Sequence, residues 1–339
     1  MEALLTPAIA RKDCLTLKCY DHIQTPQGPL AAALGSFDGL HLGHQRVIGS
    51  ALDSPGLLPA VVTFPENPLN LLRKQPVPML TTNQQRLSLL EQMGVDTVYL
   101  LPFAAIREME PEDFVRILHQ ECRVEKICCG FNFRFGREGR GDTKLLHRMC
   151  RELGMELSVS EPVSIEEAPV SSTRIRACLE KGDVVLAARM LGRPFQYDFP
   201  VVHGRQLGRT LGTPTINQPF PEGYILPRFG VYASLAHIDG KTYHGVTNIG
   251  VKPTVGAEGP LSETWLPEFS GDLYGKNIPV DLLAFIRPEK KFDNLEALQA
   301  EILRNGETAR QIAQDWERRP ENGLFSEENE KNSLAEAEK

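Results

Sequence analysis

The chain changes its pattern of apolar and polar residues near its middle. Between about residues 30 and 180, short apolar runs alternate with segments in which apolar residues recur every three or four positions. The runs predict strands at 30–37, 57–64, 96–101, 124–129 and 155–160. The periodic segments predict helices at 45–52, 83–93, 111–121, 143–153 and 172–180. Such alternation is typical of an α/β fold with a parallel, doubly wound sheet.

The second part of the chain has a β-rich pattern. After a short helix at 182–194, β-branched and aromatic runs between glycine and proline turns predict strands at 199–202, 230–236, 243–249 and 278–285. One helix at 295–317 follows them. This pattern indicates a small antiparallel barrel or sandwich. We therefore predict an α/β domain over 13–190, with an edge strand or extension in 13–29, a barrel domain over 195–319, and a disordered tail over 320–339.

Length, charge and cysteine content indicate which classes of protein the chain can belong to. A length of 339 residues suits about two domains, and the net charge of −7 argues against non-specific binding of nucleic acid. No apolar run is long enough to span a membrane, and the first twelve residues lack the apolar core of a signal peptide. The seven cysteines form no Cys-x-x-Cys pair, so we expect reduced core residues of a cytoplasmic protein. The oligomeric state is not predicted.

Residues 35–44, which read GSFDGLHLGH, join the first predicted strand to the first helix. Glycines allow a close backbone approach to a ligand, and the start of a helix attracts an anion. His41 and His44 are three residues apart, so on a helical turn they project from one face and offer N–H donors. The alternative is a surface or metal-binding histidine pair, although nearby residues lack the spacing of further zinc ligands. The candidate phosphate-binding residues here are Gly35, Phe37, Asp38, His41, Gly43 and His44.

Two further segments lie at the ends of elements in the α/β domain. Residues 130–136, which read GFNFRFG, follow the fourth strand, and Asn132, Phe133 and Arg134 could stack on and hydrogen-bond a flat ring system. A hydrophobic loop folded onto the sheet is an equally good interpretation. Residues 170–176, which read VSSTRIR, enter the last helix of the domain, where hydroxyl and guanidinium groups suit a phosphate. The alternative is a helix cap with two surface arginines. The candidates are Ser172, Thr173, Arg174 and Arg176.

The barrel domain contains one informative string, GRQLGRTLGTPTIN at 204–217. Gly204, Gly208 and Gly212 suggest a loop that approaches phosphates. Thr215 and Asn217 are two apart on an extended segment and face one side, where hydroxyl and amide oxygens suit Mg²⁺. Turn roles for both residues in a hairpin loop are the alternative.

These strings together resemble one family. Residues 35–44 resemble the His-x-Gly-His signature of nucleotidyltransferases, in the version found in prokaryotic bifunctional riboflavin kinase/FAD synthetases. Residues 130–136 and 170–176 are similar to further motifs of its adenylyltransferase half. Residues 204–217 resemble the kinase motif Gly-x-x-Leu-Gly-x-Pro-Thr-x-Asn, with Thr213 where the family usually has Phe. The resemblance spans roughly residues 30 to 316.

The resemblance implies a doubly wound nucleotidyltransferase domain followed by an antiparallel β-barrel riboflavin kinase domain. The implied chemistry is phosphorylation of riboflavin by ATP to FMN, then adenylylation of FMN by ATP to FAD and pyrophosphate. His41 and His44 would hold the reacting phosphates. Asp38 would place magnesium or a hydrogen bond. Glu263 sits where the family has its catalytic base, with Glu268 as the second candidate.

Two other functions stay open at this point. One half of the chain could be an inactive module that binds flavin or nucleotide and regulates the other half. Alternatively, a different adenylyltransferase could be fused to an unrelated barrel.

Overall fold

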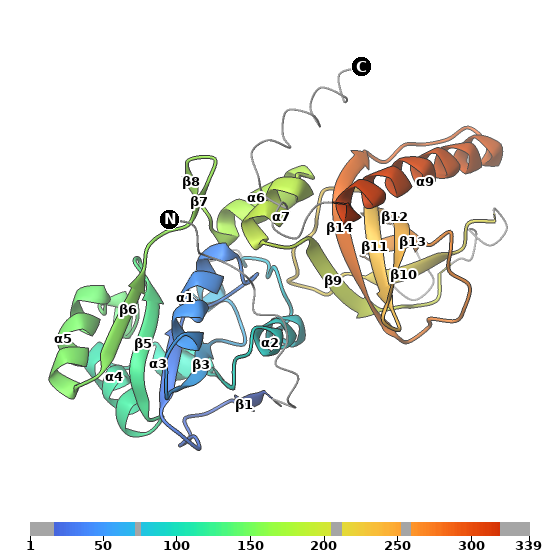
Figure 1. Cartoon of the computed structure of the whole chain (residues 1–339). Helices are drawn as coiled ribbons and strands as arrows, with labels where there is room; N and C mark the ends of the chain where they lie inside the picture. The colour runs from blue at the N-terminus through green and yellow to red at the C-terminus, as the bar shows by residue number, and fades with distance from the viewer. Residues whose placement is uncertain (1–16, 72–75, 205–211, 252–258, 319–339) are drawn as a thin grey trace. The chain divides into compact units, whose positions relative to one another are not determined.

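The computed structural model describes residues 17–71, 76–204, 212–251 and 259–318 (Figure 1). The predicted tail at 320–339 lies outside these residues. The chain divides into two units, each of which combines separate stretches of sequence. Unit 1 consists of residues 1–36, 46–68 and 86–161, and unit 2 of residues 37–45, 69–85 and 162–339.

Unit 1 contains the parallel sheet that the alternating pattern predicts. Its strand order is β1 (Lys18–Tyr20), β4 (Thr97–Leu100), β3 (Leu58–Thr63), β2 (Leu30–Leu34), β5 (Val124–Gly130) and β6 (Glu156–Ser160). All neighbouring pairs are parallel. The sequence moves outward from β2 through β3 to β4 on one side and through β5 to β6 on the other. The strand order therefore reverses between β2 and β5, as a doubly wound sheet requires.

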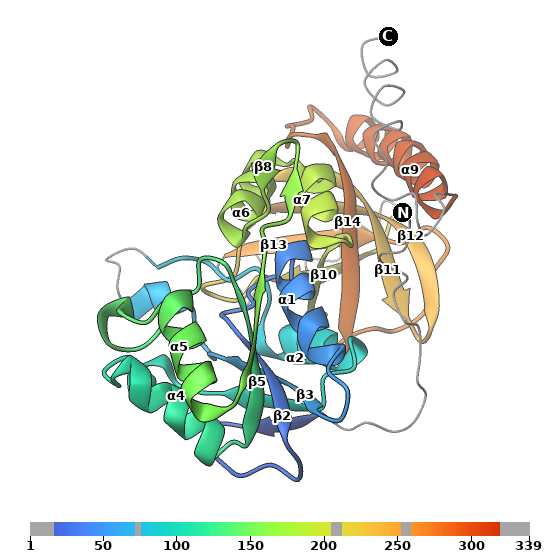
Figure 2. The ribbon, with the colours of Figure 1, turned by 60° about the vertical axis from the view of Figure 1, so that its left-hand side comes forward.

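Helices connect these strands. They are α1 (Leu42–Leu52), α2 (Asn83–Gln92), α3 (Phe103–Ile106), α4 (Pro111–Gln120) and α5 (Thr143–Leu153), with two 3₁₀ turns (Pro68–Leu71 and Arg137–Gly139). After β6 come a hairpin of β7 (Ser164–Ile165) and β8 (Ala168–Pro169) and the helices α6 (Ser172–Lys181) and α7 (Val184–Leu191), all of which belong to unit 2. Helices α4 and α5 lie next to each other beside β5 and β6 (Figure 2), and their apolar faces are buried in one core with β2 and β5.

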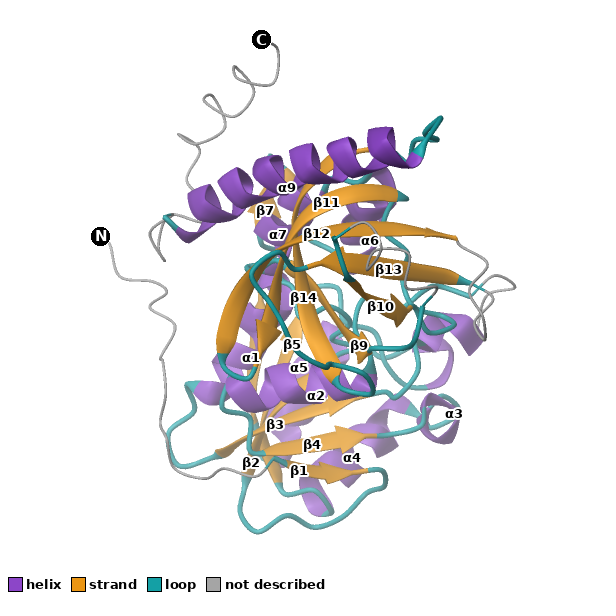
Figure 3. Ribbon diagram, turned by 90° about the vertical axis from the view of Figure 1, so that its right-hand side faces the viewer, coloured by secondary structure: helices purple, strands orange, loops and turns teal. Residues whose placement is uncertain are grey.

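Unit 2 contains the antiparallel sheet. Its order is β10 (Thr215–Pro219), β13 (Pro260–Trp265), β12 (Lys241–Val251), β11 (Gly230–Ile238), β14 (Asn277–Arg287) and β9 (Phe195–Pro200). An isolated bridge between Val202 and Asn217 joins the chain after β9 to β10, which closes the sheet into a barrel. Helix α9 (Leu295–Glu317) lies along the outside of β11 and β12 (Figure 3), where Ala309 and Ala313 are buried against the strands.

The sequence predicted four of the six barrel strands, with the strand at 199–202 displaced from β9. Strands β10 and β13 were not predicted, because the side chains they turn inward are largely polar. Inside the barrel, Thr247 bonds both Thr264 and Ser234 at 2.8 Å between hydroxyl oxygens. The amide of Gln218 donates to two backbone carbonyl oxygens, at 2.7 and 2.8 Å. These strands therefore lack the apolar alternation on which the prediction depended.

Five cysteines are buried free thiols, as predicted: Cys122, Cys128, Cys129, Cys150 and Cys178. Cys19 is exposed, and Cys14 lies outside the described residues. Burial raises the pKa of the Cys128 and Cys150 thiols to about 11 and that of Cys129 to about 12, so all three stay protonated at neutral pH. In the part of the chain that the structure describes, no helix has both the length and the apolarity to cross a membrane.

Candidate active sites

The chain leaves β2 through a strained turn, residues 37–44, which we call the His loop. Three of its residues have positive φ: Phe37 at 48°, Gly39 at 83° and Leu40 at 46°. The amide of Leu40 donates to the carbonyl oxygen of Phe37 at 3.3 Å, which closes the turn. Residues other than glycine rarely adopt this backbone conformation, and it persists only where the surroundings impose it.

Side chains hold the carbonyl oxygens of residues 38–40 from three directions. The carbonyl oxygen of residue 38 accepts from Ser172 Oγ at 2.9 Å, and that of residue 39 from the Arg193 guanidinium at 2.9 Å. The carbonyl oxygen of residue 40 accepts from Gln45 Nε2 at 2.8 Å. The donors come from the start of α6, from the segment after α7 and from α1. The loop conformation is therefore fixed by elements far apart in the sequence.

The two histidines stack on each other at the start of α1. Their ring centroids lie 3.6 Å apart at an interplanar angle of 16°, and the amide of His44 donates to His41 Nδ1 at 3.3 Å. Since Nδ1 accepts, the proton of a neutral His41 ring is on Nε2. Burial lowers the pKa of His41 to about 4, and the charges of Arg193 and Arg176 act in the same direction. At neutral pH, His41 is therefore an uncharged N–H donor.

Two neighbours define where these rings sit. A Cβ on Gly43 would lie 3.2 Å from Cε1 and 3.3 Å from Nδ1 of His41, so the missing side chain leaves room for the ring. The His44 ring meets the buried Phe37 ring edge-on, with centroids 5.3 Å apart. The sequence-predicted Phe37 and Gly43 thus support the histidines directly. Gly35 continues from β2, and its amide donates to the carbonyl oxygen of Val62 at 3.2 Å.

Asp38 and Arg176 form a buried ion pair beneath the loop, with 2% and 8% of each residue exposed. Asp38 Oδ1 also accepts from the amides of Leu80 at 2.9 Å and Thr81 at 3.3 Å. Arg176 Nε donates to the carbonyl oxygen of Pro78 at 2.6 Å. The Asp38 carboxylate therefore ties the loop to Arg176 and to the backbone at residues 80 and 81.

The other candidates at the start of α6 lie in different surroundings. The N-cap is Ser171, whose Oγ accepts from the amide of Arg174 at 3.3 Å, and Thr173 is exposed on the first turn. The Arg174 guanidinium donates to the carbonyl oxygens of Ile165 at 2.8 Å and Ala168 at 3.0 Å in the β7–β8 hairpin. Ser172 and Arg176 therefore contact the His loop directly, whereas the Arg174 side chain bonds to the hairpin.

The predicted flavin-contacting segment follows β5, the strand next to β2 where the sheet order reverses. Asn132 and Arg134 are exposed there, and Arg134 lies 3.8 Å from the carboxylate of Asp142. Phe133 is partly exposed and stacks on the buried Phe135, with ring centroids 5.6 Å apart. The interpretation as a loop folded onto the sheet is right for Phe135, while the three candidate residues remain accessible. Ligands of doubly wound sheets bind at such reversals, at the carboxyl ends of the strands.

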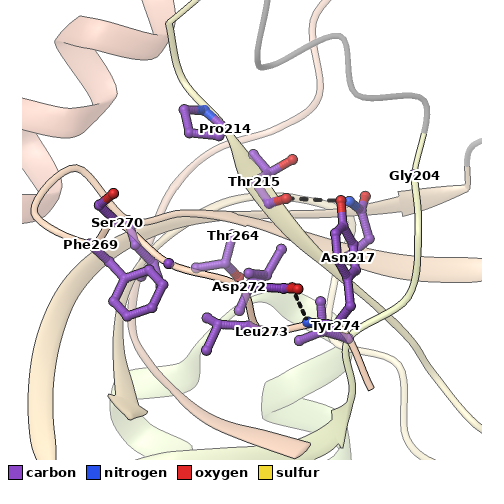
Figure 4. Close-up of a pocket in the computed structure, with 14 residues that line it drawn as sticks. Gly204, Pro214, Thr215, Asn217, Thr264, Phe269, Ser270, Asp272, Leu273 and Tyr274 are labelled. Carbon is purple, nitrogen blue, oxygen red and sulfur yellow. Dashed lines mark hydrogen bonds between the residues drawn. The ribbon is translucent and has the colours of Figure 1, made fainter. Parts of the chain in front are cut away.

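The barrel has its own pocket, with a volume of about 490 Å³ (Figure 4). Thr215 and Asn217 of β10 line it, with Gly204 beside Asn217, and Asp272 and Tyr274 line it as well. A Cβ on Gly204 would come within 2.6 Å of Asn217 Nδ2, so this glycine makes room for the amide. Gly212 is described, with φ 71°, whereas Gly208 lies outside the described residues.

Strand register distinguishes the two candidate bases. Glu263 of β13 pairs directly with Asn217 of β10 on one side and with Asn248 of β12 on the other. Side chains of directly paired residues project from the same face of a sheet. Glu268 follows the end of β13, is exposed and lines a separate cavity of about 270 Å³ beside α9. The register therefore places Glu263, and not Glu268, in a row with the predicted metal ligand.

The sequence indicated most of these residues, including Ser172, but not Arg193 and Gln45, which also bond to the His loop from outside it. Neither Arg193 nor Gln45 belongs to one of the motif strings. Within the described ranges, no cluster of three or more His, Cys, Asp or Glu side chains could hold a metal ion.

Comparison with known proteins identifies both halves. The family model for FAD synthetase matches residues 23–174, and that for riboflavin kinase matches residues 191–313. A bifunctional riboflavin kinase/FMN adenylyltransferase of Bacillus subtilis is 34% identical over 85% of this chain and 93% of its own length. A bifunctional riboflavin kinase/FMN adenylyltransferase of Escherichia coli K12 is 35% identical over 85% of this chain and 94% of its own length.

A solved structure from Streptococcus pneumoniae, described as a macrolide-efflux protein, matches 87% of this chain and 98% of its own, with a TM-score of 0.78 and 27% identity. Because the match covers 87% of this chain, it includes parts of both the α/β domain and the barrel domain. With the relatives above, it confirms the resemblance that the motifs indicated. The chain belongs to the family of bifunctional riboflavin kinase/FMN adenylyltransferases.

Proposed function

We propose that this chain makes FAD in two ATP-dependent steps, with riboflavin phosphorylated in the barrel and FMN adenylylated at the His loop. The observation that carries the proposal is that both family models match one chain, each over the half that contains the corresponding motif residues. We also propose that the boundary between the two catalytic domains lies at residues 190–195.

In adenylylation, a phosphate oxygen of FMN attacks the α-phosphorus of ATP. The bond from that phosphorus to the bridging oxygen breaks, and pyrophosphate leaves with the electron pair. No nucleophilic side chain is required, so catalysis consists of positioning and of stabilising the charge that develops on the phosphoryl oxygens. The neutral, buried His41 and its stacked neighbour His44 are suited to donate hydrogen bonds there.

The start of α6 is proposed to receive the leaving pyrophosphate. Ser172 and Thr173 lie on its first turn, where backbone amides and the helix dipole favour an anion. Arg176 and Arg174 add positive charge, although both guanidinium groups already bond to carbonyl oxygens. Asn132, Phe133 and Arg134 are proposed to contact the flavin.

In phosphorylation, the 5′-hydroxyl of riboflavin attacks the γ-phosphorus of ATP, and Glu263 takes the hydroxyl proton. Thr215 and Asn217 offer a hydroxyl and an amide oxygen to the barrel pocket, a neutral oxygen set that fits Mg²⁺, and Glu263 pairs with Asn217 across the neighbouring strands. A bound metal would neutralise charge on the phosphates. Gly204, Gly208 and Gly212 are proposed to let the preceding loop approach those phosphates.

The activity test is incubation with riboflavin, ATP and Mg²⁺, with flavins separated by chromatography over time. FMN should appear first and then convert to FAD. Accumulation of FMN without FAD would instead favour the alternative that the α/β half is a binding or regulatory module. Omission of the metal, and its replacement by Ca²⁺, tests the choice of cation.

Two substitutions test the assignment of the sites. His44→Ala should abolish FAD formation and leave FMN formation intact, since loss of one preorganised donor costs roughly 3–4 kcal/mol of transition-state stabilisation. Glu263→Gln should do the reverse, and Glu268→Gln is its matched control. If either active-site variant reduced both activities equally, the assignment of separate sites would be wrong.

A further inference from the structure

We propose that Arg193 is a positioning residue for adenylylation, although it lies in the segment that the riboflavin kinase model matches. This inference rests on the proposed role of the His loop. It means that the conformation of the adenylylation loop depends on a side chain from beyond residues 23–174, which the FAD synthetase model matches.

The contacts of Arg193 concentrate on the two peptide groups that precede His41. Nη2 donates to the carbonyl oxygen of Gly39 at 2.9 Å, and Nη1 donates to that of Leu40 at 3.4 Å. Nη1 also donates to the carbonyl oxygen of Leu191, at the end of α7, at 3.3 Å. The planar guanidinium thus ties two successive loop carbonyls to the end of a helix, a geometry that the single ammonium of lysine does not reproduce.

The loop needs such support because of its backbone conformation. Gly39 and Leu40 have φ angles of 83° and 46°, and the second is unfavourable for a residue with a branched side chain. Strained residues of this kind hold their conformation only when neighbouring groups impose it. If the peptide groups on either side of Leu40 rotated, the direction in which His41 leaves the loop would change. The hydrogen bonds that Arg193 donates to the carbonyl oxygens of Gly39 and Leu40 oppose this rotation.

Arg193 also influences the charge state of His41. The charged and titratable groups that face His41 are Arg176 on α6, His44 on α1 and Arg193 after α7. Asp38 is nearby but is paired with Arg176. The two guanidinium charges add to the effect of burial and disfavour a protonated ring. Removal of the Arg193 charge should therefore make His41 easier to protonate.

The experiment uses the full chain with Arg193→Met, Arg193→Lys and the control Arg228→Met. Arg228 belongs to the same unit and also donates to a carbonyl oxygen, that of Lys181, but its guanidinium lies over the Phe285 ring. Rates of both reactions are measured as functions of substrate concentration and pH.

Arg193→Met should lower kcat of adenylylation by roughly 10- to 100-fold, the scale expected when a catalytic group is misplaced by up to about 1 Å. Its kinase rate should stay near that of the unsubstituted chain. The acid limb of its adenylylation profile should move to higher pH, because a cation near His41 is gone. Arg193→Lys should also lose kcat but keep the acid limb of the unsubstituted chain. Arg228→Met should change neither property.

The inference is wrong if Arg193→Met keeps both the adenylylation kcat and the acid limb, or if both activities fall together. If Arg193→Met does not fold, the ratio of the two activities in Arg193→Lys decides, since that variant keeps the charge. His44→Ala is assayed in parallel. An active His44→Ala would refute the proposed adenylylation site itself, whereas an inactive His44→Ala beside a fully active Arg193→Met would refute only the role of Arg193.

Discussion

Replacing Gly43 with alanine should stabilise the protein and slow adenylylation at the same time. Gly43 lies in the first turn of α1, where glycine is a poor helix former. Alanine in a helix is favoured over glycine by up to about 1 kcal/mol, and by less near a helix end. The free energy of unfolding should therefore rise by a few tenths of a kcal/mol.

The same methyl group crowds the His41 ring. It would lie 3.2 Å from Cε1 of His41, whereas ordinary contacts of a Cβ begin at 3.4 Å, so the ring must move by a few tenths of an ångström. A displacement of about 1 Å can cost about a hundredfold in rate, so a shift of this size should lower kcat of adenylylation by about three- to tenfold. The kinase rate should not change.

Gly49→Ala is the matched control, since Gly49 belongs to the same helix and a Cβ there meets no atom within 4 Å. It should gain stability like Gly43→Ala and keep full adenylylation. The measurements are thermal unfolding and initial rates of FMN and FAD formation for both variants. Full adenylylation by Gly43→Ala would refute the argument that catalysis requires the observed position of His41.

Three further predictions follow from single contacts. Gly204→Ala should displace the Asn217 amide and raise the Mg²⁺ concentration for half-maximal kinase activity by about tenfold; an unchanged Mg²⁺ titration would exclude Asn217 as a ligand. Asp38→Asn should leave the buried Arg176 charge without its carboxylate and lower the free energy of unfolding by about 3–5 kcal/mol, as measured by urea titration; an unaltered midpoint would contradict this. The folded pKa of His41, about 4, lies below its ordinary value of 6.5, so its contribution to stability is complete above pH 6.5 and is lost as pH falls towards 4. The pH dependence of unfolding should be weaker over that range in His41→Gln, and identical curves would argue against a buried neutral ring.

Local sequence patterns predicted much of this architecture. The helices at 143–153 and 295–317 begin and end at the predicted residues, because caps and apolar periodicity are properties of neighbouring positions. The five strands of the alternating pattern were found for the same reason. The motif strings also indicated both candidate sites, since their glycines, histidines and hydroxyl residues lie close together in the chain.

Other features depended on residues that only folding brings together. The inward-facing side chains of β10 and β13 are largely polar and bond to neighbouring strands: Thr264 of β13 bonds Thr247 of β12, and Gln218 of β10 donates to the carbonyl oxygens of Phe199 and Ile278. Neither strand therefore shows an apolar period of its own. That Glu263, and not Glu268, pairs with Asn217 follows from the register of β13 against β10, which the sequence does not contain.

Side-chain patterns alone were enough to predict the alternating elements of the α/β domain, the β-rich class of the second domain and the residues of the His loop. Which groups hold that loop in place became known only from the folded chain. Arg193 donates to the carbonyl oxygen of Gly39 across 154 residues of chain, and Ser172 donates to that of Asp38 across 134. A carbonyl group occurs at every residue and leaves no trace in a pattern of side chains, so its partner becomes known only when the backbone path is known.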